Sequence, residues 1–169
     1  QIRITKSLGW RNIEARNIDG TNIHELSDHD FNTVADKLGT ADVQVNCFGA
    51  AIANWATKIT EPFEATLDKV SRTIPRMQRL NSKLIRIMSY ARPEEGEDLM
   101  ENERFKRLKE ITKRFLDAGI TPVHENCMNY GGMSYQHTLK MLDNVPGLKL
   151  VFDTGNPVFN RDYSKPVPH

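Results

Sequence analysis

Residues 121–153 read TPVHENCMNYGGMSYQHTLKMLDNVPGLKLVFD, and this segment decides the fold class. A short apolar run over residues 121–125 leads into a glycine-bearing loop and then into an amphipathic stretch that Ser134 can cap. After a Pro-Gly turn, a second apolar run covers residues 148–153. The order of strand, helix and strand is typical of a βαβ unit with parallel strands.

The same alternation extends from this segment back towards the start of the chain. Earlier apolar runs predict three further strands, and apolar residues at helical spacing predict three further helices. The predicted strands cover residues 12–18, 42–48 and 83–88, and the predicted helices begin after Ser27, begin at Thr60 and cover residues 97–118. The chain therefore contains about five β/α units.

The length of the chain restricts the architecture further. Two arrangements fit five parallel strands: a complete open α/β sheet, or part of a parallel (β/α) barrel of the TIM type. A complete barrel takes about 250 residues, whereas this chain has 169. Because the chain begins abruptly and ends soon after a strand, we expect a partial TIM-type barrel that forms a single domain over residues 1–169.

Composition argues against several classes of protein. Lys and Arg total 23 and Asp and Glu total 22, which leaves a net charge of +1 and gives no strong field to attract nucleic acid or an anionic membrane. No apolar run approaches the roughly 20 residues that cross a bilayer. Cys47 and Cys127 show neither disulfide nor zinc spacing. We therefore expect a cytoplasmic protein with no nucleic-acid or membrane partner.

Two of the predicted strands end in carboxylates. Glu125 closes the run over residues 121–125, and Asp153 closes the next run. Because the carboxyl ends of parallel strands meet at one edge of a sheet, both side chains could converge on one cation there. Oxygen ligands suit Mg²⁺ or Mn²⁺. The alternative from spacing alone is that each carboxylate caps the loop that follows it.

Two motifs carry a family resemblance. HENCMNYGG at residues 124–132, followed by VFDTGN at residues 151–156, resembles the xylose isomerase-like TIM-barrel superfamily of sugar isomerases and epimerases. The N-terminal segment NIEARNIDG at residues 12–20 is similar to the second strand of that superfamily and its loop. On this resemblance the five strands correspond to the second to the sixth strand of the barrel.

The resemblance implies a metal site and a reaction. In that superfamily a glutamate and an aspartate at these positions bind a divalent metal, which here implies Glu125 and Asp153, with Mn²⁺ or Mg²⁺ as the main expectation and Zn²⁺ or Co²⁺ as alternatives. A histidine and a second glutamate from two later strands complete the family site, and this sequence contains neither strand. Where many relatives have a further histidine, this chain has Asn156, which can still bond a sugar hydroxyl.

The chemistry implied by the resemblance is isomerisation or epimerisation of a sugar, a sugar phosphate or a keto-acid sugar through an enediolate. Glu125 is then both a metal ligand and one half of the acid/base pair that moves a carbon-bound proton. The metal polarises the substrate oxygens. Since the second carboxylate of that pair is missing from this sequence, we expect little turnover from these residues alone.

Other residues are candidates for substrate binding. Glu14 and Arg16 alternate on one face of the first predicted strand and could pair with each other or lie near the substrate. Arg86 is costly to bury without a partner, so we expect it to meet Glu14 or a substrate oxygen. Trp55 could form the wall of a sugar pocket, with a core aromatic as the alternative.

The histidines are weaker candidates. Strand alternation places His124 on the opposite side from Glu125, which favours packing behind the sheet over catalysis. The remaining ones considered, His24, His29 and His137, fall in predicted loops or helices, and we expect them at the surface.

Two alternatives to an isomerase remain open. One is a sugar-binding or remnant barrel domain without a working site, which the missing ligands favour. The other, less supported, is an AP endonuclease-like metal hydrolase, which needs additional zinc-binding histidines and a basic surface. For the isomerase we expect a small-molecule sugar as partner, with a homo-oligomer as one option because an incomplete barrel exposes sheet edges.

Overall fold

The strands form one five-stranded parallel sheet in the order β1-β4-β5-β6-β7, beside a two-stranded antiparallel hairpin of β2 and β3. This computed structural model describes residues 1–94 and 96–156. The elements are α1 (Ile2–Ser7), β1 (Asn12–Ala15), β2 (Asn17–Ile18), β3 (Thr21–Asn22), α2 (Asp28–Thr40), β4 (Gln44–Gly49), α3 (Phe63–Arg79), β5 (Leu84–Ile87), α4 (Glu101–Asp117), β6 (Thr121–Glu125), the 3-10 turn η1 (Tyr130–Gly132), α5 (Tyr135–Asn144) and β7 (Lys149–Val151). Sequential parallel strands joined by helices confirm the predicted α/β class and the partial TIM-barrel architecture.

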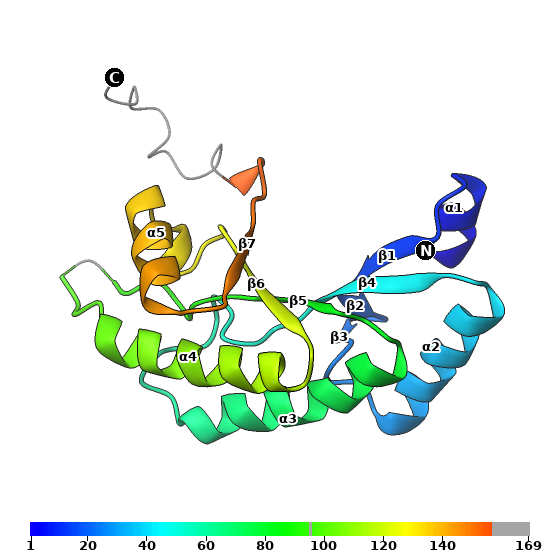
Figure 1. Cartoon of the computed structure of the whole chain (residues 1–169), viewed down its shortest axis with the longest axis horizontal. Coiled ribbons are helices and arrows are strands. Elements are labelled where there is room, and N and C mark those ends of the chain that lie inside the picture. The colour runs from blue at the N-terminus through cyan, green and yellow to red at the C-terminus, as the bar shows by residue number, and fades with distance from the viewer. Residues whose placement is uncertain (95, 157–169) are drawn as a thin grey trace.

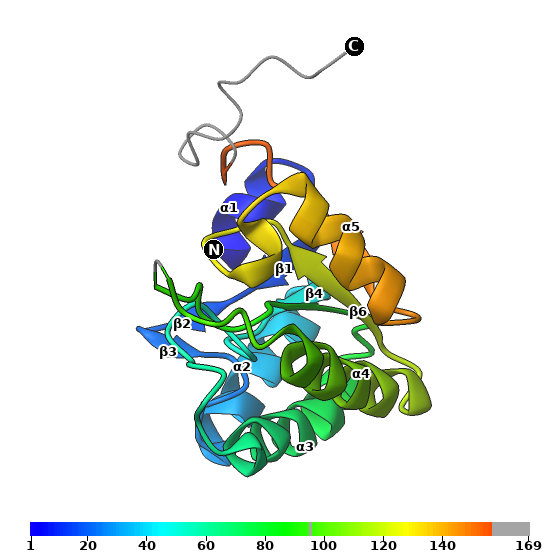
Figure 2. The ribbon, with the colours of Figure 1, turned by 90° about the vertical axis from the view of Figure 1, so that its left-hand side faces the viewer.

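The larger helices lie on one side of the sheet. Figure 1 shows α2, α3 and α4 below the strands and α5 beyond β6, while the upper side of the sheet carries none of these helices. Figure 2 turns the ribbon and shows α3 and α4 side by side, in agreement with their direct contacts. The sheet therefore has a helix-covered face and an open face, and we define the open face as the one that carries Glu14, Arg86 and Glu125.

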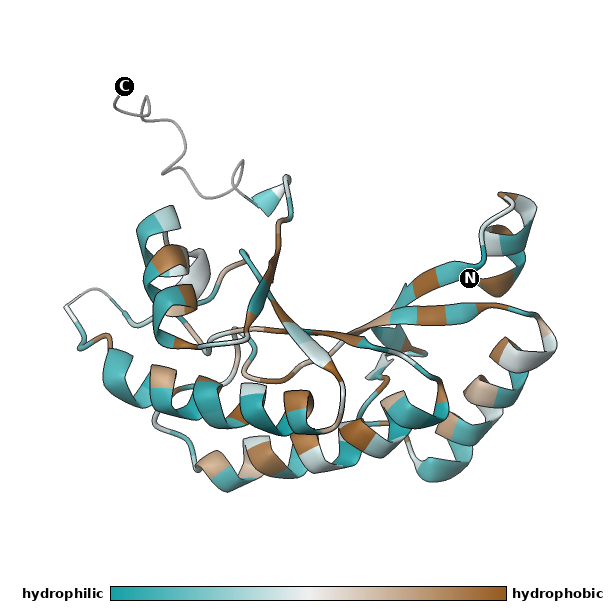
Figure 3. Ribbon diagram, viewed as in Figure 1, coloured by the Kyte–Doolittle hydropathy of each residue, from teal (hydrophilic) through white to brown (hydrophobic). Residues whose placement is uncertain are grey.

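The core lies between the sheet and the helices. Phe48, Ile85 and Ile87 have no exposed surface and belong to the main apolar cluster, whereas Leu84 on the open face is 39% exposed. Figure 3 shows hydrophobic residues, in brown, on the strands and on separate turns of largely hydrophilic, teal helices. No helix in the described part of the chain is both long and apolar enough to cross a bilayer.

A β-bulge sets the faces of β4. Ile13 pairs with Val45 and Glu14 pairs with Cys47, so Asn46 has no counterpart on β1. The extra residue reverses the alternation, because Val45 and Phe48 are both buried on the helix side. Gly49, next to Phe48, is thereby placed on the open face, where it pairs in register with Arg86.

The N-terminal region differs from the prediction. The strand expected over residues 12–18 is interrupted after Ala15, and Asn17–Ile18 folds back on Thr21–Asn22 as a hairpin. Asp19 and Gly20 both have positive φ angles, 49° and 87°, which two-residue hairpin turns require. The helix α1 was not predicted at all.

The other boundaries agree more closely. Ser27 and Ser134 cap α2 and α5 through their hydroxyl groups, as predicted. The strand predicted over residues 121–125 is β6 with the same limits, whereas β7 stops before Asp153. The helix predicted over 97–118 begins only at Glu101 because Met100 before it adopts a left-handed φ of 48°. The helix predicted to start at Thr60 begins at Phe63, and β4 runs over Gln44–Gly49 instead of residues 42–48.

Candidate functional site

Glu125 is the last residue of β6 and stands on the open face. Successive residues of a strand point to opposite faces, so His124 is directed to the helix side and Glu125 away from it. The Glu125 side chain is only 13% exposed. Its Oε2 contacts Nη1 of Arg86, and its Oε1 accepts a hydrogen bond of 3.3 Å from Nδ2 of Asn156. Both carboxylate oxygens are therefore engaged, and the residue is held in one orientation.

Arg86 on β5 joins this carboxylate to a second one on β1. Its Nε and Nη2 each lie 2.8 Å from Oε1 of Glu14, and its side chain is 9% exposed. Burial disfavours the charge, but the neighbouring Glu125 and Glu14 outweigh it and raise the pKa of Arg86 above its ordinary value. The prediction that Arg86 meets Glu14 is confirmed, and the contact with Glu125 adds a second partner.

Gly49 makes this chain of three charges possible. It lies on β4, between the strands of Glu14 and Arg86. A Cβ at Gly49 would lie 2.7 Å from Oε1 of Glu14 and 2.8 Å from Nη2 of Arg86. Only a residue without a side chain lets the guanidinium cross above β4 to reach Glu14.

Asp153 is held at the neighbouring edge by Asn126. The amide of Asn126 accepts from the backbone N–H of Asp153 at 2.6 Å and donates to its carbonyl at 3.1 Å. The Asp153 side chain accepts from the N–H of Gly155 at 2.7 Å and is exposed. Val151, the last residue of β7, pairs in register with Glu125, so Asp153 lies two residues beyond the end of the strand next to β6.

The donors at this edge fit a hard divalent cation in kind. Carboxylate oxygens of Glu125 and Asp153, with the amide oxygen of Asn156, are the ligand types that Mg²⁺ and Mn²⁺ prefer. Within residues 1–94 and 96–156, no three His, Cys, Asp or Glu side chains gather at one point. The described part of the chain therefore contains no complete metal site of three such side chains.

A buried polar network supports the loop behind Glu125. His124 has no exposed surface, and its Nε2 lies 3.0 Å from Oγ of Ser89 and 2.9 Å from Oδ1 of Asn129. Asn129 also donates to the carbonyl of Glu125 at 3.2 Å. Burial lowers the pKa of His124 to about 4. Its expected place behind the sheet is confirmed.

Three expectations need correction. Glu14 and Arg16 do not pair, because Glu14 is occupied by Arg86 while the guanidinium of Arg16 lies 5.4 Å from the centre of the Trp55 ring. Trp55 is 46% exposed, which excludes the core alternative. His24 was expected at the surface but is fully buried, with Nδ1 on Asn22, whereas His29 is exposed and His137 half-buried.

Sequence reasoning missed the residues that hold the site together. Asn126 fixes the backbone of Asp153, and Asn129 and Ser89 fix the loop after β6. Asn126 and Asn129 lie within the motif at residues 124–132, so their closeness to Glu125 was a usable signal. No sequence signal pointed to Ser89, since its partners lie 35 and 40 residues away.

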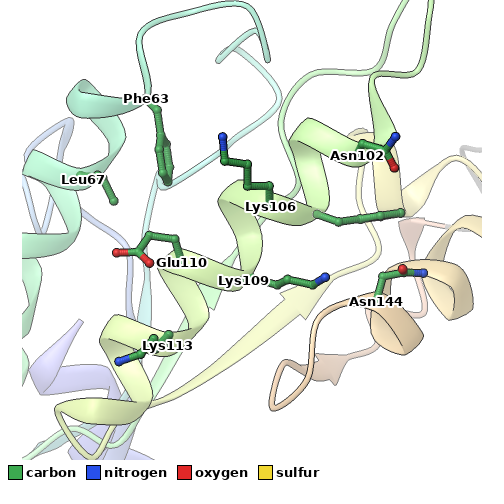
Figure 4. Close-up of a pocket in the computed structure, with 9 residues that line it drawn as sticks. Phe63, Leu67, Asn102, Lys106, Lys109, Glu110, Lys113 and Asn144 are labelled. Carbon is green, nitrogen blue, oxygen red and sulfur yellow. The ribbon is translucent and has the colours of Figure 1, made fainter.

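A further groove lies away from these residues. A groove of about 620 Å³ runs between α3, α4 and α5 on the helical surface. Figure 4 shows Lys106, Lys109 and Lys113 along one side of α4 in this groove. Lys113 pairs with Asp117 and Lys106 with Glu103. These charges agree with a solvated helix face, and the groove is remote from the carboxyl edge of the sheet.

Comparison with known proteins identifies the fold. A Mycobacterium smegmatis xylose isomerase-like TIM-barrel protein in complex with magnesium matches 99% of this chain and 58% of its own length, with 16% identity and a TM-score of 0.77. The probable 3-DHS dehydratase AsbF of Bacillus anthracis matches 90% of this chain and 56% of its own, with 18% identity and a TM-score of 0.73. A structure of L-ribulose 3-epimerase matches 95% and 56%, with 15% identity and a TM-score of 0.63.

The chain thus spans a little over half the length of these three structures. At such identities the likeness shows the fold alone, and these proteins are named for different reactions. No curated protein sequence gave a significant match. The family model of the xylose isomerase-like TIM barrel, however, matches residues 2–167. Because this match covers nearly the whole sequence, the chain belongs to the xylose isomerase-like TIM-barrel family.

Proposed function

We propose that this chain belongs to a divalent-metal-dependent carbohydrate isomerase or epimerase that acts through an enediolate. The observation that carries the proposal is Glu125, a little-exposed carboxylate at the carboxyl end of a barrel strand, with Asp153 two residues beyond the end of the adjacent strand. In TIM barrels the catalytic groups sit at this end of the strands. Several members of the fold with recorded activities are enzymes, including an epimerase and a probable dehydratase.

Glu125 would move the proton. Its Oε2 is committed to Arg86, whereas its Oε1 has only the longer contact with Asn156, so Oε1 is the atom that would take a proton from the substrate carbon. Arg86 fixes the direction of the carboxylate. Asn156 could release Oε1 and donate to a sugar hydroxyl instead.

Glu125 and Asp153 would hold the metal. When bound, the metal supplies polarisation of the substrate oxygens and stabilises the negative charge that develops on them. The fold also occurs in a Mycobacterium smegmatis protein in complex with magnesium and in the IOLI protein with a bound zinc atom, which supports a divalent cation. The oxygen donors of Glu125 and Asp153 favour Mg²⁺ or Mn²⁺ over Zn²⁺ or Co²⁺. The partner would be a small sugar, and the net charge of +1 argues against a nucleic acid.

Proton exchange in heavy water tests the proposal. The whole encoded protein is incubated with Mn²⁺ or Mg²⁺ and a panel of ketoses, sugar phosphates and sugar acids, and deuterium incorporation next to the carbonyl is followed by mass spectrometry. Glu125→Gln should slow exchange at least about 100-fold, the usual contribution of a positioned acid or base. Glu64→Gln, an exposed glutamate on α3, is the matched control. Exchange that is independent of both the metal and Glu125 would contradict the proposal.

One observation favours a second candidate, a sugar-binding domain without catalysis. Arg86 contacts the same carboxylate that a metal would need, and it neutralises that charge. Calorimetric titration with Mn²⁺ separates the two functions. The enzyme is supported if Asp153→Asn weakens Mn²⁺ binding at least about tenfold. The control Asp143→Asn, on the exposed side of α5, should leave Mn²⁺ binding unchanged. Sugar binding without metal binding supports the second candidate.

A further inference from the structure

A small polar cavity lies at the carboxyl edge of the sheet. Its volume is about 200 Å³, and it is formed by the segments that follow β1, β4 and β5. Since a water molecule takes about 30 Å³ of liquid, the cavity has room for a carboxylate or phosphate group. The polar and aromatic groups that line it include Arg16, Asn17, Glu25, Asn54 and Trp55.

Arg16 is the uncommitted cation of this cavity. Glu14, two residues before it, is bonded to Arg86, and the Arg16 side chain has no hydrogen bond or ion pair with any described residue. Its guanidinium lies 5.4 Å from the centre of the Trp55 ring, and both side chains are exposed. An aromatic ring under a guanidinium limits its motion and leaves its N–H groups free for a planar anion.

Asn54 adds an oriented donor. Its Oδ1 accepts from the N–H of Ala56 at 3.0 Å and from the N–H and hydroxyl of Thr57 at 3.1 and 3.0 Å. These three donors determine which end of the amide is the oxygen, so the NH₂ group is the free end. Asn17 is similar, because its Oδ1 accepts from Asn22 at 3.3 Å and its NH₂ group is left for a ligand.

Glu25, the carboxylate among the residues that line the cavity, does not neutralise the positive charge of Arg16. Oε1 of Glu25 lies 3.3 Å from Nζ of Lys69 and 3.6 Å from Nε2 of His24. The charge of Glu25 is therefore balanced by Lys69, and the charge of Arg16 is not balanced by any described side chain. The cavity as a whole presents one positive charge and several N–H donors.

The cavity is next to the proposed reaction centre. A Cβ placed on Gly49 would lie 3.1 Å from Cβ of Arg16 as well as against Glu14 and Arg86, so these side chains meet around one point. On the other side, Met88 lines the cavity, and its sulfur lies 3.4 Å from the sulfur of Cys127, two residues after Glu125. A single sugar could span both places.

We propose that this cavity binds the carboxylate or phosphate group of an anionic carbohydrate through Arg16, Asn54 and Asn17, while the reacting carbon lies at Glu125. The inference rests on the proposed function and narrows its substrate class from sugars in general to sugar acids or sugar phosphates. Trp55 would pack against the guanidinium on one side and the apolar face of the sugar on the other.

Trp55 provides a binding signal that does not depend on catalysis. The chain has two tryptophans, and Trp10 is 63% exposed outside the cavity, so Trp10→Phe leaves Trp55 as the reporter. The whole protein with this change is titrated with fructose 6-phosphate, glucuronate and fructose while tryptophan fluorescence is recorded. We expect at least one anionic sugar to bind about tenfold or more tightly than fructose, in line with a charge-assisted contact. Preference for fructose 6-phosphate assigns a phosphate, and preference for glucuronate assigns a carboxylate.

Variants at Arg16 complete the test. Arg16→Gln should abolish the preference for the anion, and Arg16→Lys should keep part of it, because a lysine retains the charge without the planar fork. Arg11→Gln, at an exposed arginine paired only with Asp42 at 3.7 Å, is the matched control. Equal binding of charged and neutral sugars, no binding of any of the three, or an unchanged preference in Arg16→Gln would overturn the inference.

The outcomes separate this inference from the proposed function. Anion-selective binding without proton exchange leaves the inference standing and rejects the isomerase. Metal-dependent exchange of neutral sugars that Arg16→Gln does not alter leaves the isomerase standing and rejects the inference.

Discussion

The two faces of the sheet are built from the same strands, but one carries buried apolar residues and the other carries charged residues. On the helix-covered face, Phe48, Ile85 and Ile87 are fully buried among other apolar side chains. On the open face, Glu14, Arg86 and Glu125 form a chain of charges across the same strands. Alternate residues of one strand thus serve different purposes: the covered residues supply the stability that allows the open ones to be arranged for chemistry.

The largest effect should come from the covered face. Phe48→Ala removes a fully buried ring from the core and should lower the free energy of unfolding by about 3–5 kcal/mol. Leu84→Ala, on the open face and 39% exposed, should cost less than about 1.5 kcal/mol because much of its surface already meets water. Urea denaturation measures both. Similar losses for the two variants would remove the distinction between the faces.

Removing the cation from the open face should have the next largest effect. Arg86→Met leaves Glu14 and Glu125 without their shared partner and should cost about 3 kcal/mol, since an uncompensated charge remains in a little-exposed site. Arg114→Met breaks an exposed pair with Glu110 and should cost less than about 1 kcal/mol. Adding Glu125→Gln to Arg86→Met should restore part of the stability. If the double variant is no more stable than Arg86→Met alone, the unpaired charge of Glu125 is not the cause of the lost stability.

Lowering the pH should reduce the stability of the protein through the buried residue His24. This histidine faces Glu25 and, on α3, Lys69, Arg72 and Arg76; burial lowers its pKa to about 4. Because its ordinary pKa is 6.5, the unfolded chain binds the extra proton between these values, so stability falls as the pH drops from 6.5 to 4, by about 2 to 3 kcal/mol. His24→Gln should flatten that part of the stability curve, measured by denaturation at each pH. The exposed His29→Gln is the control and should leave the slope unchanged.

The smallest effects are expected from alanine substitutions at two glycines. Gly49→Ala should destabilise the fold by about 1–3 kcal/mol, because its Cβ would meet Glu14 and Arg86. Gly39→Ala, in α2 with open space around it, should instead stabilise the fold by roughly 0.5–1 kcal/mol, the usual gain of alanine in a helix. Thermal unfolding distinguishes the signs. A stabilising Gly49→Ala would show that the guanidinium does not need the space above β4.

Local signals in the sequence were sufficient for much of the fold. The hydroxyl caps at Ser27 and Ser134 and the apolar run of β6 depend on neighbouring residues, so their boundaries could be predicted. The start of α4 could not, because Glu97 and Leu99 are good helix formers and no residue type marks the left-handed backbone of Met100.

The candidate site was less predictable because its contacts are long-range. Glu125 and Asp153 were identified from strand ends and from the family motif; Glu125 does end β6, whereas β7 stops two residues before Asp153, and their role stays a prediction. Arg86 reaches partners 72 and 39 residues away in sequence. The bulge at Asn46 changes which residues of β4 face the site, and alternation by two does not reveal it. His24 was misjudged because a polar residue in a predicted loop gives no sign that the hairpin will enclose it.

The amide of Asn126 has a consequence for how this edge of the barrel tolerates change. A side-chain amide has the same donor and acceptor as a peptide unit, so its two bonds to Asp153 imitate one more rung of the ladder between β6 and β7. The position of Asp153 is therefore fixed by its hydrogen bonds to Asn126 after β6, and not by the length of the chain between α5 and β7. Insertions or deletions in the turn before β7 should be absorbed there, and the spacing between the two carboxylates should persist while that turn varies in length.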